Sequence, residues 1–358
     1  MYTLEIAQRF HEKLNGAVYP DRVVEALLEK DFYPLDKEQK TAYLYNLFNG
    51  LMLYDLKPEI IVGIYRALMK LDSYKRENVA VATIPDSIVL ECTGSGKKPY
   101  KTLNISTPSI ITAVASGAKI IKKGSGTTSS VIGSADLLYG LGFREETADE
   151  NRLKMLQDTG FAFVNIERVI PVFNSFYNGH FYKPHILSYI LAADVTSLRG
   201  NKIIYGLSGA DVMKCCKCLI FNNSCKDITV YSSTENDIEF YDELIGNGIC
   251  YVARKKEDSS LPTISQYALK TPSPSLVTAA PNKKESIYAI VELLKSHTNK
   301  AYCDIVCHNA GFYLLEAAIV NDIQTGKELA MDSIMSGRSY HKLIEIIKCS
   351  GGRPTWYA

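Results

Sequence analysis

Two turns rich in glycine and hydroxyl residues constrain the fold most, because each lies between an expected strand and an expected helix. The first, Cys92-Thr93-Gly94-Ser95-Gly96, follows the apolar run 87–90 and precedes Asn104-Ile105-Ser106-Thr107-Pro108. The second spans 122–130 and follows an expected strand at 119–121. Glycine lets backbone N–H groups approach an anion closely, and a helix N-terminus favours negative charge. The two turns therefore predict phosphate binding in an α/β fold, although each alone is also typical of an ordinary turn.

The pattern of apolar residues divides the chain into two parts. Residues 1–75 have helical periodicity only, with a capping box at Asp36 and Gln39 and a first-turn proline at Pro58. Segment 164–195 is aromatic and poor in acid, and we expect it to form helices that return to the N-terminal bundle. Elsewhere strands and helices alternate, which is typical of an α/β domain. The further expected strands are 202–205, 227–231, 249–252 and 303–307.

This organisation predicts a small α-helical domain followed by a large α/β domain with a central mixed sheet. The small domain comprises 1–75 and is completed by 164–195. The large domain comprises 76–163 and 196–358 and carries both glycine-rich turns.

Composition limits the classes of partner. Lys and Arg number 40 against 39 Asp and Glu, so the net charge of +1 gives no overall attraction to nucleic acid or membrane. The most apolar stretch, 110–121, is too short to span a bilayer, and the N-terminus has no signal pattern. Nine cysteines without a small-scaffold spacing indicate reduced thiols and a cytoplasmic protein. We expect no zinc site at Cys215, Cys216 and Cys218, because no second paired-cysteine motif follows at zinc spacing.

The order of these motifs resembles the anthranilate phosphoribosyltransferase family. That family has Gly-Thr-Gly-Gly-Asp before Asn-x-Ser-Thr, then Lys-His-Gly-Asn-Arg-x-x-Ser-Ser, and later an Asp-Glu pair. This chain has 92–96 and 104–107 in the first positions, 122–130 in the next, and Asp242-Glu243 in the last. The resemblance implies a nucleoside phosphorylase/anthranilate phosphoribosyltransferase-like fold. It also implies Mg²⁺-dependent use of phosphoribosyl pyrophosphate, and a homodimer formed through the N-terminal helices.

The resemblance also implies roles for particular residues. Ser106, Asp242 and Glu243 would bind Mg²⁺, since hard oxygen ligands suit that ion. Without the resemblance, an Asp-Glu pair is most often a solvated helix face. The residues that would bind phosphoribosyl pyrophosphate are Thr93, Gly94, Ser95, Asn104, Ser106, Thr107, Lys122 and Ser130.

The chain departs from the family in both substrate regions. Cys92 and Ser95 replace glycines, and a two-residue expansion brings Lys97 and Lys98, which could restore positive charge together with Lys123. In the acceptor region Asn178 falls near the arginine that the family pairs with the anthranilate carboxylate. Aromatic residues surround it, either as core or as the wall of a different pocket. The acceptor-binding candidates are Asn178, Tyr177, His180 and Tyr182.

The sequence therefore predicts a phosphoribosyltransferase acting on an aromatic or heteroaromatic acceptor, in specialised metabolism, with anthranilate a poor substrate. One alternative is an anthranilate phosphoribosyltransferase of tryptophan biosynthesis with a reshaped pocket. Another is a non-catalytic paralogue that binds nucleic acid or protein. The altered glycine-rich turn favours that paralogue, whereas the retained Ser106, Lys122 and Asp242-Glu243 disfavour it.

Overall fold

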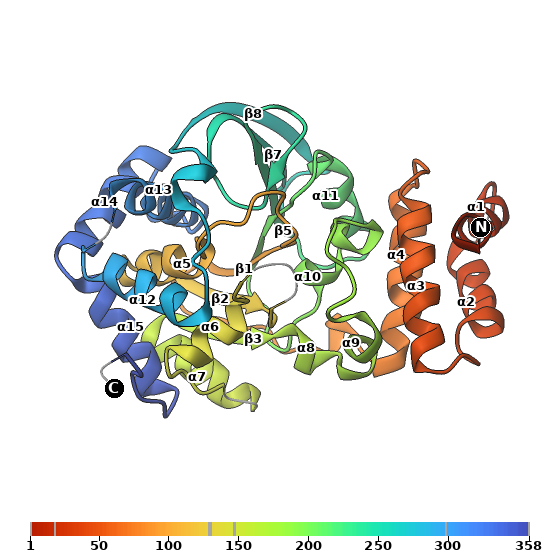
Figure 1. The fold of residues 1–358 in the computed structure, drawn as a ribbon, viewed down its shortest axis with the longest axis horizontal. Coiled ribbons are helices and arrows are strands. Elements are labelled where there is room, and N and C mark those ends of the chain that lie inside the picture. Colours follow the sequence, from red (N-terminus) through yellow and green to blue (C-terminus); the bar gives the residue numbers. More distant parts are fainter. Residues whose placement is uncertain (1, 18, 128–130, 146–147, 298, 357–358) are drawn as a thin grey trace.

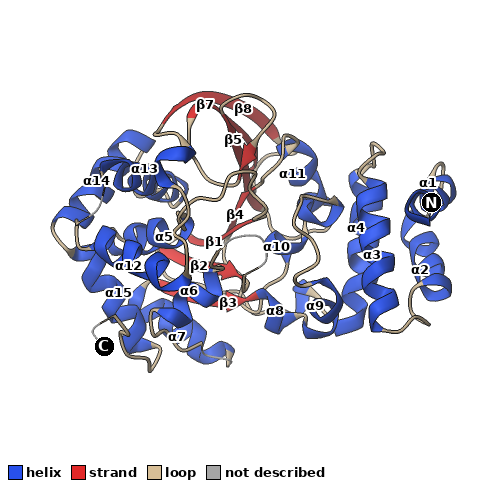
Figure 2. Ribbon diagram, viewed as in Figure 1, coloured by secondary structure: helices blue, strands red, loops and turns tan. Residues whose placement is uncertain are grey.

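The protein has a helical part at its N-terminal end and a large sheet covered by helices on both faces (Figures 1 and 2). The computed structural model describes residues 2–17, 19–127, 131–145, 148–297 and 299–356. This arrangement confirms the predicted class, a helical domain joined to an α/β domain.

Local sequence signals explain the N-terminal helices. The Asp36 side chain accepts a hydrogen bond from the Gln39 N–H and the Gln39 side chain returns one, which confirms the capping box of α3. Pro58 lies in the first turn of α4, as expected. The helices are α1 (Tyr2–Leu14), α2 (Pro20–Asp31), α3 (Lys37–Leu51) and α4 (Pro58–Met69), followed by the 3₁₀ turns η1 (Lys70–Asp72) and η2 (Arg76–Asn78).

The aromatic segment packs in the same hydrophobic core as these helices. The carboxylate of Asp72 accepts hydrogen bonds from the N–H groups of Val172 and Phe173, at 2.7 and 2.8 Å, and so caps α9. Phe48 of α3 stacks on His185 with ring centroids 5.2 Å apart. The elements of this segment are α8 (Ile166–Val169), α9 (Pro171–Tyr177), η3 (Ile186–Tyr189) and α10 (Leu191–Asp194). The exact domain boundaries remain a prediction.

The sheet is mixed, as expected. Within the described residues its order is β3-β2-β1-β4-β5-β7-β8, with β6 pairing only with β5. The first five strands in that order run parallel, and the pairs that join β5 to β7 and β7 to β8 are antiparallel. The strands are β1 (Val89–Gly94), β2 (Lys119–Gly124), β3 (Phe161–Asn165), β4 (Lys202–Gly206), β5 (Asp227–Thr234), β6 (Phe240–Tyr241), β7 (Asn247–Lys255) and β8 (Thr263–Lys270).

Helices cover both faces of this sheet, with α5 and α12 on one side and α10 and α11 on the other (Figure 1). The expected strand 303–307 is wrong, because these residues lie inside α13. The Asn299 side chain accepts a hydrogen bond from the Tyr302 N–H at 2.7 Å and starts that helix. The remaining helices are α5 (Ser106–Ala115), α6 (Ser134–Gly140), α7 (Asp149–Thr159), α11 (Val212–Phe221), η4 (Pro274–Val277), α12 (Lys283–Leu294), α13 (Lys300–Glu316), α14 (Ile323–Met335) and α15 (Arg338–Cys349).

A buried ionic network ties the segment after the N-terminal helices to the sheet. Glu91 of β1 is fully buried and accepts hydrogen bonds from Arg76 at 2.5 Å, Lys123 at 3.0 Å and the Gly200 N–H at 2.9 Å. The guanidinium of Arg76 also donates to the backbone carbonyl of Asp194 at 2.6 Å. Burial alone would raise the pKa of Glu91, but the charges of Arg76 and Lys123 lower it, so the carboxylate stays ionised.

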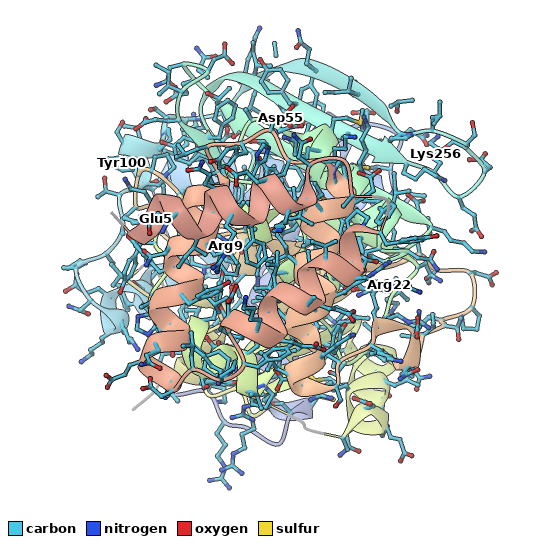
Figure 3. All side chains as sticks on the ribbon, turned by 90° about the vertical axis from the view of Figure 1, so that its right-hand side faces the viewer. Glu5, Arg9, Arg22, Asp55, Tyr100 and Lys256 are labelled. Carbon is cyan, nitrogen blue, oxygen red and sulfur yellow. The ribbon has the colours of Figure 1, made fainter. Side chains whose placement is uncertain are left out.

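The N-terminal helices, through which the resemblance implies a homodimer, bury most of their large apolar residues within the chain. Tyr43, Leu47, Phe48 and Leu51 lie in the core of the same chain, whereas Tyr45, Met52 and Leu53 are exposed. Figure 3 looks onto this side of the molecule, where α1 and α2 carry the labelled polar residues Glu5, Arg9 and Arg22.

No helix in the described part of the chain is long and apolar enough to cross a membrane. All nine cysteines lie within the described residues, and each is a reduced thiol. Cys215, Cys216 and Cys218 lie on α11 and are buried in the hydrophobic core, where burial raises the pKa of each thiol.

Candidate active site

A cavity of about 200 Å³ lies at the carboxyl ends of β1 and β2. From β1 the chain continues through α5 to β2 on one side, and β4 lies on the other side of β1. The cavity therefore sits at the point where the strand order reverses, which is the usual ligand site of open α/β sheets. Both glycine-rich turns contribute to its wall.

Two glycines let the acidic pair approach the strand ends. A Cβ atom on Gly94 would lie 2.3 Å from Asp242 Oδ2, and one on Gly206 would lie 2.0 Å from the Asp242 carbonyl oxygen. Neither distance is possible for a real side chain, so only glycine permits this contact. The position of Asp242 thus depends on the sequences of β1 and β4.

The first glycine-rich turn is held by its backbone and by Ser95. The Ser95 N–H donates to the Gly206 carbonyl oxygen at 2.8 Å, and the Ser95 hydroxyl accepts from the Ser208 N–H at 2.8 Å. Thr93, Gly94 and Ser95 all line the cavity. Cys92 does not, because its side chain is fully buried in the hydrophobic core below the turn.

Asn104 lies just before α5 and binds the first turn of that helix. Its side-chain oxygen accepts a hydrogen bond from the Thr107 N–H at 3.0 Å. Ser106 is thereby free to face the cavity, where its hydroxyl accepts a hydrogen bond from Lys122 Nζ at 3.2 Å. Thr107 is buried and is not part of the cavity wall.

Lys122 places a cation in the wall of the cavity. Its side chain is almost completely buried, and burial lowers the pKa of Lys122 to about 8, although Asp242 and Glu243 partly oppose this. A bound polyanion would favour the charged form. The neighbouring Lys123 has a structural role instead, because its ammonium is bound to Glu91 and to the carbonyl oxygen of Ala193.

The acidic pair has two different environments. Asp242 Oδ2 accepts a hydrogen bond from the Gly96 N–H at 2.8 Å, whereas its buried Oδ1 has no hydrogen-bond partner among the described residues. Glu243 is bound by Lys98, whose Nζ lies 2.8 and 2.6 Å from its two carboxylate oxygens. Burial raises the pKa of Glu243 to about 7, and the charge of Lys98 acts in the opposite direction. Lys98 therefore neutralises the carboxylate that we had expected to bind a metal ion.

An aromatic wall closes the other end of the cavity. Tyr177, Asn178 and Phe181 line it, together with Leu191 and Ala192. The side-chain oxygen of Asn178 is buried and has no hydrogen-bond partner within the described ranges. A ligand with an N–H group could satisfy it.

Some predicted site residues lie elsewhere. Gly179 has a left-handed backbone, with φ of +76°, and the chain turns there. As a result His180 and Tyr182 are exposed and line a separate shallow surface depression beside Tyr45, so we exclude them from the acceptor site. Ser130 lies outside the described residues.

The sequence did not predict where the side chain of Lys97 would lie. Lys97 lines the cavity at the aromatic end and contacts Tyr177 and His185. The expansion of the turn showed that extra lysines were present, but no local pattern indicated where their side chains would lie.

Comparisons with known proteins agree with this site. Residues 86–177 match the family described as "Glycosyl transferase family, a/b domain", and this range includes both glycine-rich turns and the start of the aromatic wall. The anthranilate phosphoribosyltransferase of Pyrobaculum aerophilum is 27% identical over 275 residues, which cover 73% of this chain and 77% of that protein. The enzyme of that name from a Thermoanaerobacter species is 25% identical over 349 residues, covering 87% and 94%.

Solved structures show the same fold. Anthranilate phosphoribosyltransferase from Thermus thermophilus superimposes with a TM-score of 0.70 at 20% identity, covering 96% of this chain and 99% of that one. The enzyme from Saccharomyces cerevisiae in complex with PRPP and Mg gives a TM-score of 0.69 at 18% identity, covering 92% and 91%.

The glycosyltransferase match and the cavity at the strand ends define the class: the protein is a phosphoribosyltransferase, an enzyme that transfers a pentosyl group. The two sequence relatives and the two structural neighbours described above are all anthranilate phosphoribosyltransferases. The family match, the sequence relatives and the structural neighbours all indicate the anthranilate phosphoribosyltransferase family.

Proposed function

We propose that the protein transfers the phosphoribosyl group of phosphoribosyl pyrophosphate to the amino group of anthranilate. The observation that carries the proposal is a single cavity with phosphate-binding groups at one end and an aromatic wall at the other. The relatives are named for this reaction, whereas nothing in them points to specialised metabolism. Anthranilate, although the acceptor region of the sequence predicts that it is a poor substrate, is therefore the first acceptor to test.

The donor would bind along the glycine-rich turn. The backbone of Thr93, Gly94 and Ser95 suits a pyrophosphate, and Lys122 with Ser106 suits a phosphate oxygen. The acceptor nitrogen attacks C1 of the ribose as the bond from C1 to pyrophosphate breaks, and the nitrogen then loses a proton. Fixed positive groups near the departing oxygens stabilise the charge that develops there. Holding both substrates in one cavity supplies the rest of the rate enhancement through orientation.

Mg²⁺ fits this site in part. Asp242 Oδ1 is a buried carboxylate oxygen that the described residues leave unsatisfied, and Ser106 offers a hydroxyl in the same cavity. These two residues would hold the ion, while Glu243 is occupied by Lys98. When bound, the ion would neutralise charge on the pyrophosphate. One structural neighbour contains both PRPP and Mg.

Turnover measurements test the proposal. The assay contains phosphoribosyl pyrophosphate, Mg²⁺ and either anthranilate or a panel of neutral and heteroaromatic acceptors. We expect phosphoribosyl transfer to anthranilate and loss of that transfer in the Asp242→Ala/Glu243→Ala double variant, with the fold unchanged by circular dichroism. Transfer to another acceptor alone would instead support the prediction from the sequence, in which Asn178 disfavours a carboxylate. Transfer to none, with no binding of the donor in a calorimetric titration, would refute the function.

A further inference from the structure

Lys97 and Lys98 are consecutive but their side chains reach opposite ends of the cavity. Lys98 binds Glu243 at the donor end. Lys97 lies at the aromatic end, with its Nζ 3.0 Å from Tyr177 Oη and 2.8 Å from His185 Nε2. The backbone explains the divergence, because Gly96 and Lys97 both have left-handed φ values, +63° and +66°. Such a conformation is costly for a lysine, so the surrounding contacts must hold it.

Three uncharged polar groups position the ammonium of Lys97. Tyr177 and His185 also hydrogen bond to each other at 2.9 Å, and Ser188 Oγ lies 3.4 Å from the ammonium. Burial lowers the pKa of His185 well below its usual range, so the imidazole is neutral at pH 7. Burial also lowers the pKa of Lys97 to about 7. An anionic ligand group beside the ammonium would restore its charged form.

The side chains around Lys97 indicate the shape and chemistry of the ligand that would fit beside it. Tyr177 and Phe181 stack with ring centroids 4.7 Å apart, and both line the cavity with Ile170. Lys97 lies over the Tyr177 ring, 5.5 Å from its centroid. The unsatisfied oxygen of Asn178 adds a hydrogen-bond acceptor. A flat ring, an anionic substituent and an N–H donor would each find a partner here.

We propose that Lys97 is the specificity-determining cation of the acceptor site and binds the carboxylate of an aromatic amine. This inference rests on the proposed function, and it supplies the cationic partner that Asn178 cannot. A buried carboxylate without such a partner would bind poorly. The acceptor class is thereby an aromatic amine that carries a carboxylate, rather than a neutral heteroaromatic compound.

Two other basic residues of the aromatic segment are poor candidates for this role. Arg168 is exposed and forms an ion pair with Glu145, 3.1 Å away. Lys183 is exposed as well. Neither residue lines the cavity, so their variants serve as matched controls for a loss of positive charge.

The test compares Lys97→Met with wild type, using anthranilate and its uncharged analogue 2-aminobenzamide at saturating phosphoribosyl pyrophosphate. A charge-assisted contact predicts that kcat/KM for anthranilate falls about 10- to 100-fold. We expect kcat/KM for the uncharged analogue and calorimetric affinity for the donor to change less than about twofold. Lys97→Arg should retain part of the preference for the carboxylate, whereas Arg168→Met and Lys183→Met should behave as wild type.

Equal losses with both acceptors, or weakened donor binding in Lys97→Met, would overturn the proposal. Lys97→Gln replaces the variant if Lys97→Met does not fold. If the wild type turns over neither acceptor, the proposed function fails, but titration with anthranilate in the presence of the donor still tests Lys97. Tighter binding to wild type than to the variant supports the role of Lys97, and equal binding contradicts it.

Discussion

Lys98 shows how one residue can change the chemistry of an otherwise retained motif. The Asp242-Glu243 pair is present, yet both oxygens of Glu243 contact the ammonium of Lys98. A buried ion pair of this kind neutralises the carboxylate without a metal ion, although Oε2 of Glu243 has no hydrogen-bond partner among the described residues. Lys98 would therefore compete with a metal ion for Glu243, whereas Asp242 and Ser106 have no such competitor in our proposal.

Removing Lys98 should strengthen metal binding. In Lys98→Met the carboxylate of Glu243 is released, and we expect the affinity for Mn²⁺, in the absence of substrates, to rise at least about fivefold. The measurement is titration of free Mn²⁺ by electron paramagnetic resonance at pH 8.5. The alkaline pH matters because burial raises the pKa of Glu243, loss of Lys98 removes a charge that lowers it, and a protonated carboxyl competes with the metal.

Lys101→Met is the control for this experiment. Lys101 also lines the cavity, but its ammonium donates to the backbone carbonyl of Lys98 at 3.1 Å instead of contacting the acidic pair. Its loss should leave Mn²⁺ affinity unchanged. Equal Mn²⁺ affinities of wild type and Lys98→Met would show that Lys98 does not compete with a metal.

At the scale of single residues, the sequence predicted which residues lie in the cavity better than it predicted which groups they contact. Lys122, Ser106 and Asp242 were selected by motif order, and the structure brings them to one cavity. His180 and Tyr182 were selected because they are near Asn178 in sequence, and the turn at Gly179 directs them elsewhere. Nearness in sequence cannot predict side-chain direction across a left-handed residue.

At the scale of secondary-structure elements, Gly94 at the end of β1 and Gly206 at the end of β4 leave the space that Asp242 occupies. Gly206→Ala would place a methyl group 2.0 Å from the Asp242 carbonyl oxygen. We expect the free energy of unfolding to fall by about 1–3 kcal/mol, since a packed interior does not accommodate added volume. Urea denaturation measures this loss, and calorimetry should show weaker donor binding because Asp242 is displaced.

Gly209→Ala provides the comparison three residues later. The nearest atom to its added methyl group would be Leu207 Cγ at 3.6 Å, which is an ordinary contact. This variant should be as stable as wild type to within about 0.5 kcal/mol. If the two alanine variants unfold at the same urea concentration, close packing against Asp242 is not what requires Gly206.

Elements with a strong local signal were predicted from sequence, and those whose signal was ambiguous were not. The capping box of α3 and the parallel strands next to the glycine-rich turns fall in this first group. The error at 303–307 arose because a short run of four apolar residues around Asp304 fits a strand as well as a helix. The cap at Asn299 lies four residues earlier and resolves the ambiguity only when the whole of α13 is considered.

At the scale of the whole molecule, the ionic network around Glu91 joins segments that are far apart in sequence. Lys123→Met should lower the free energy of unfolding by about 3–5 kcal/mol, because part of the compensation for a buried carboxylate is lost. Arg9→Met removes the surface pair with Asp31 and should cost less than about 1 kcal/mol. Urea denaturation measures both losses. Similar losses of unfolding free energy would show that the buried Glu91 network stabilises the protein no more than the surface pair does.

The homodimer expected from the family resemblance remains a prediction. Most of the large apolar residues of α3 lie in the core of their own chain. Tyr45, Met52 and Leu53 are exposed and could contact a partner subunit. We expect light scattering at micromolar concentration to report a dimer, and Met52→Glu/Leu53→Glu to report a monomer. A monomeric wild type would contradict the dimer. A dimeric double variant would move the interface away from these residues.

The two adjacent lysines of the expanded turn also affect how this enzyme could change during evolution. Because Lys97 reaches the acceptor end and Lys98 the donor end, one insertion or deletion in 93–98 would alter both subsites at once. A mutation in this turn that favours a new acceptor would then also disturb binding of the donor. Substitutions in the aromatic wall, such as at Phe181 or Leu191, avoid that cost because they leave the turn intact. Libraries aimed at new acceptors should therefore vary the wall and keep the length of the turn fixed.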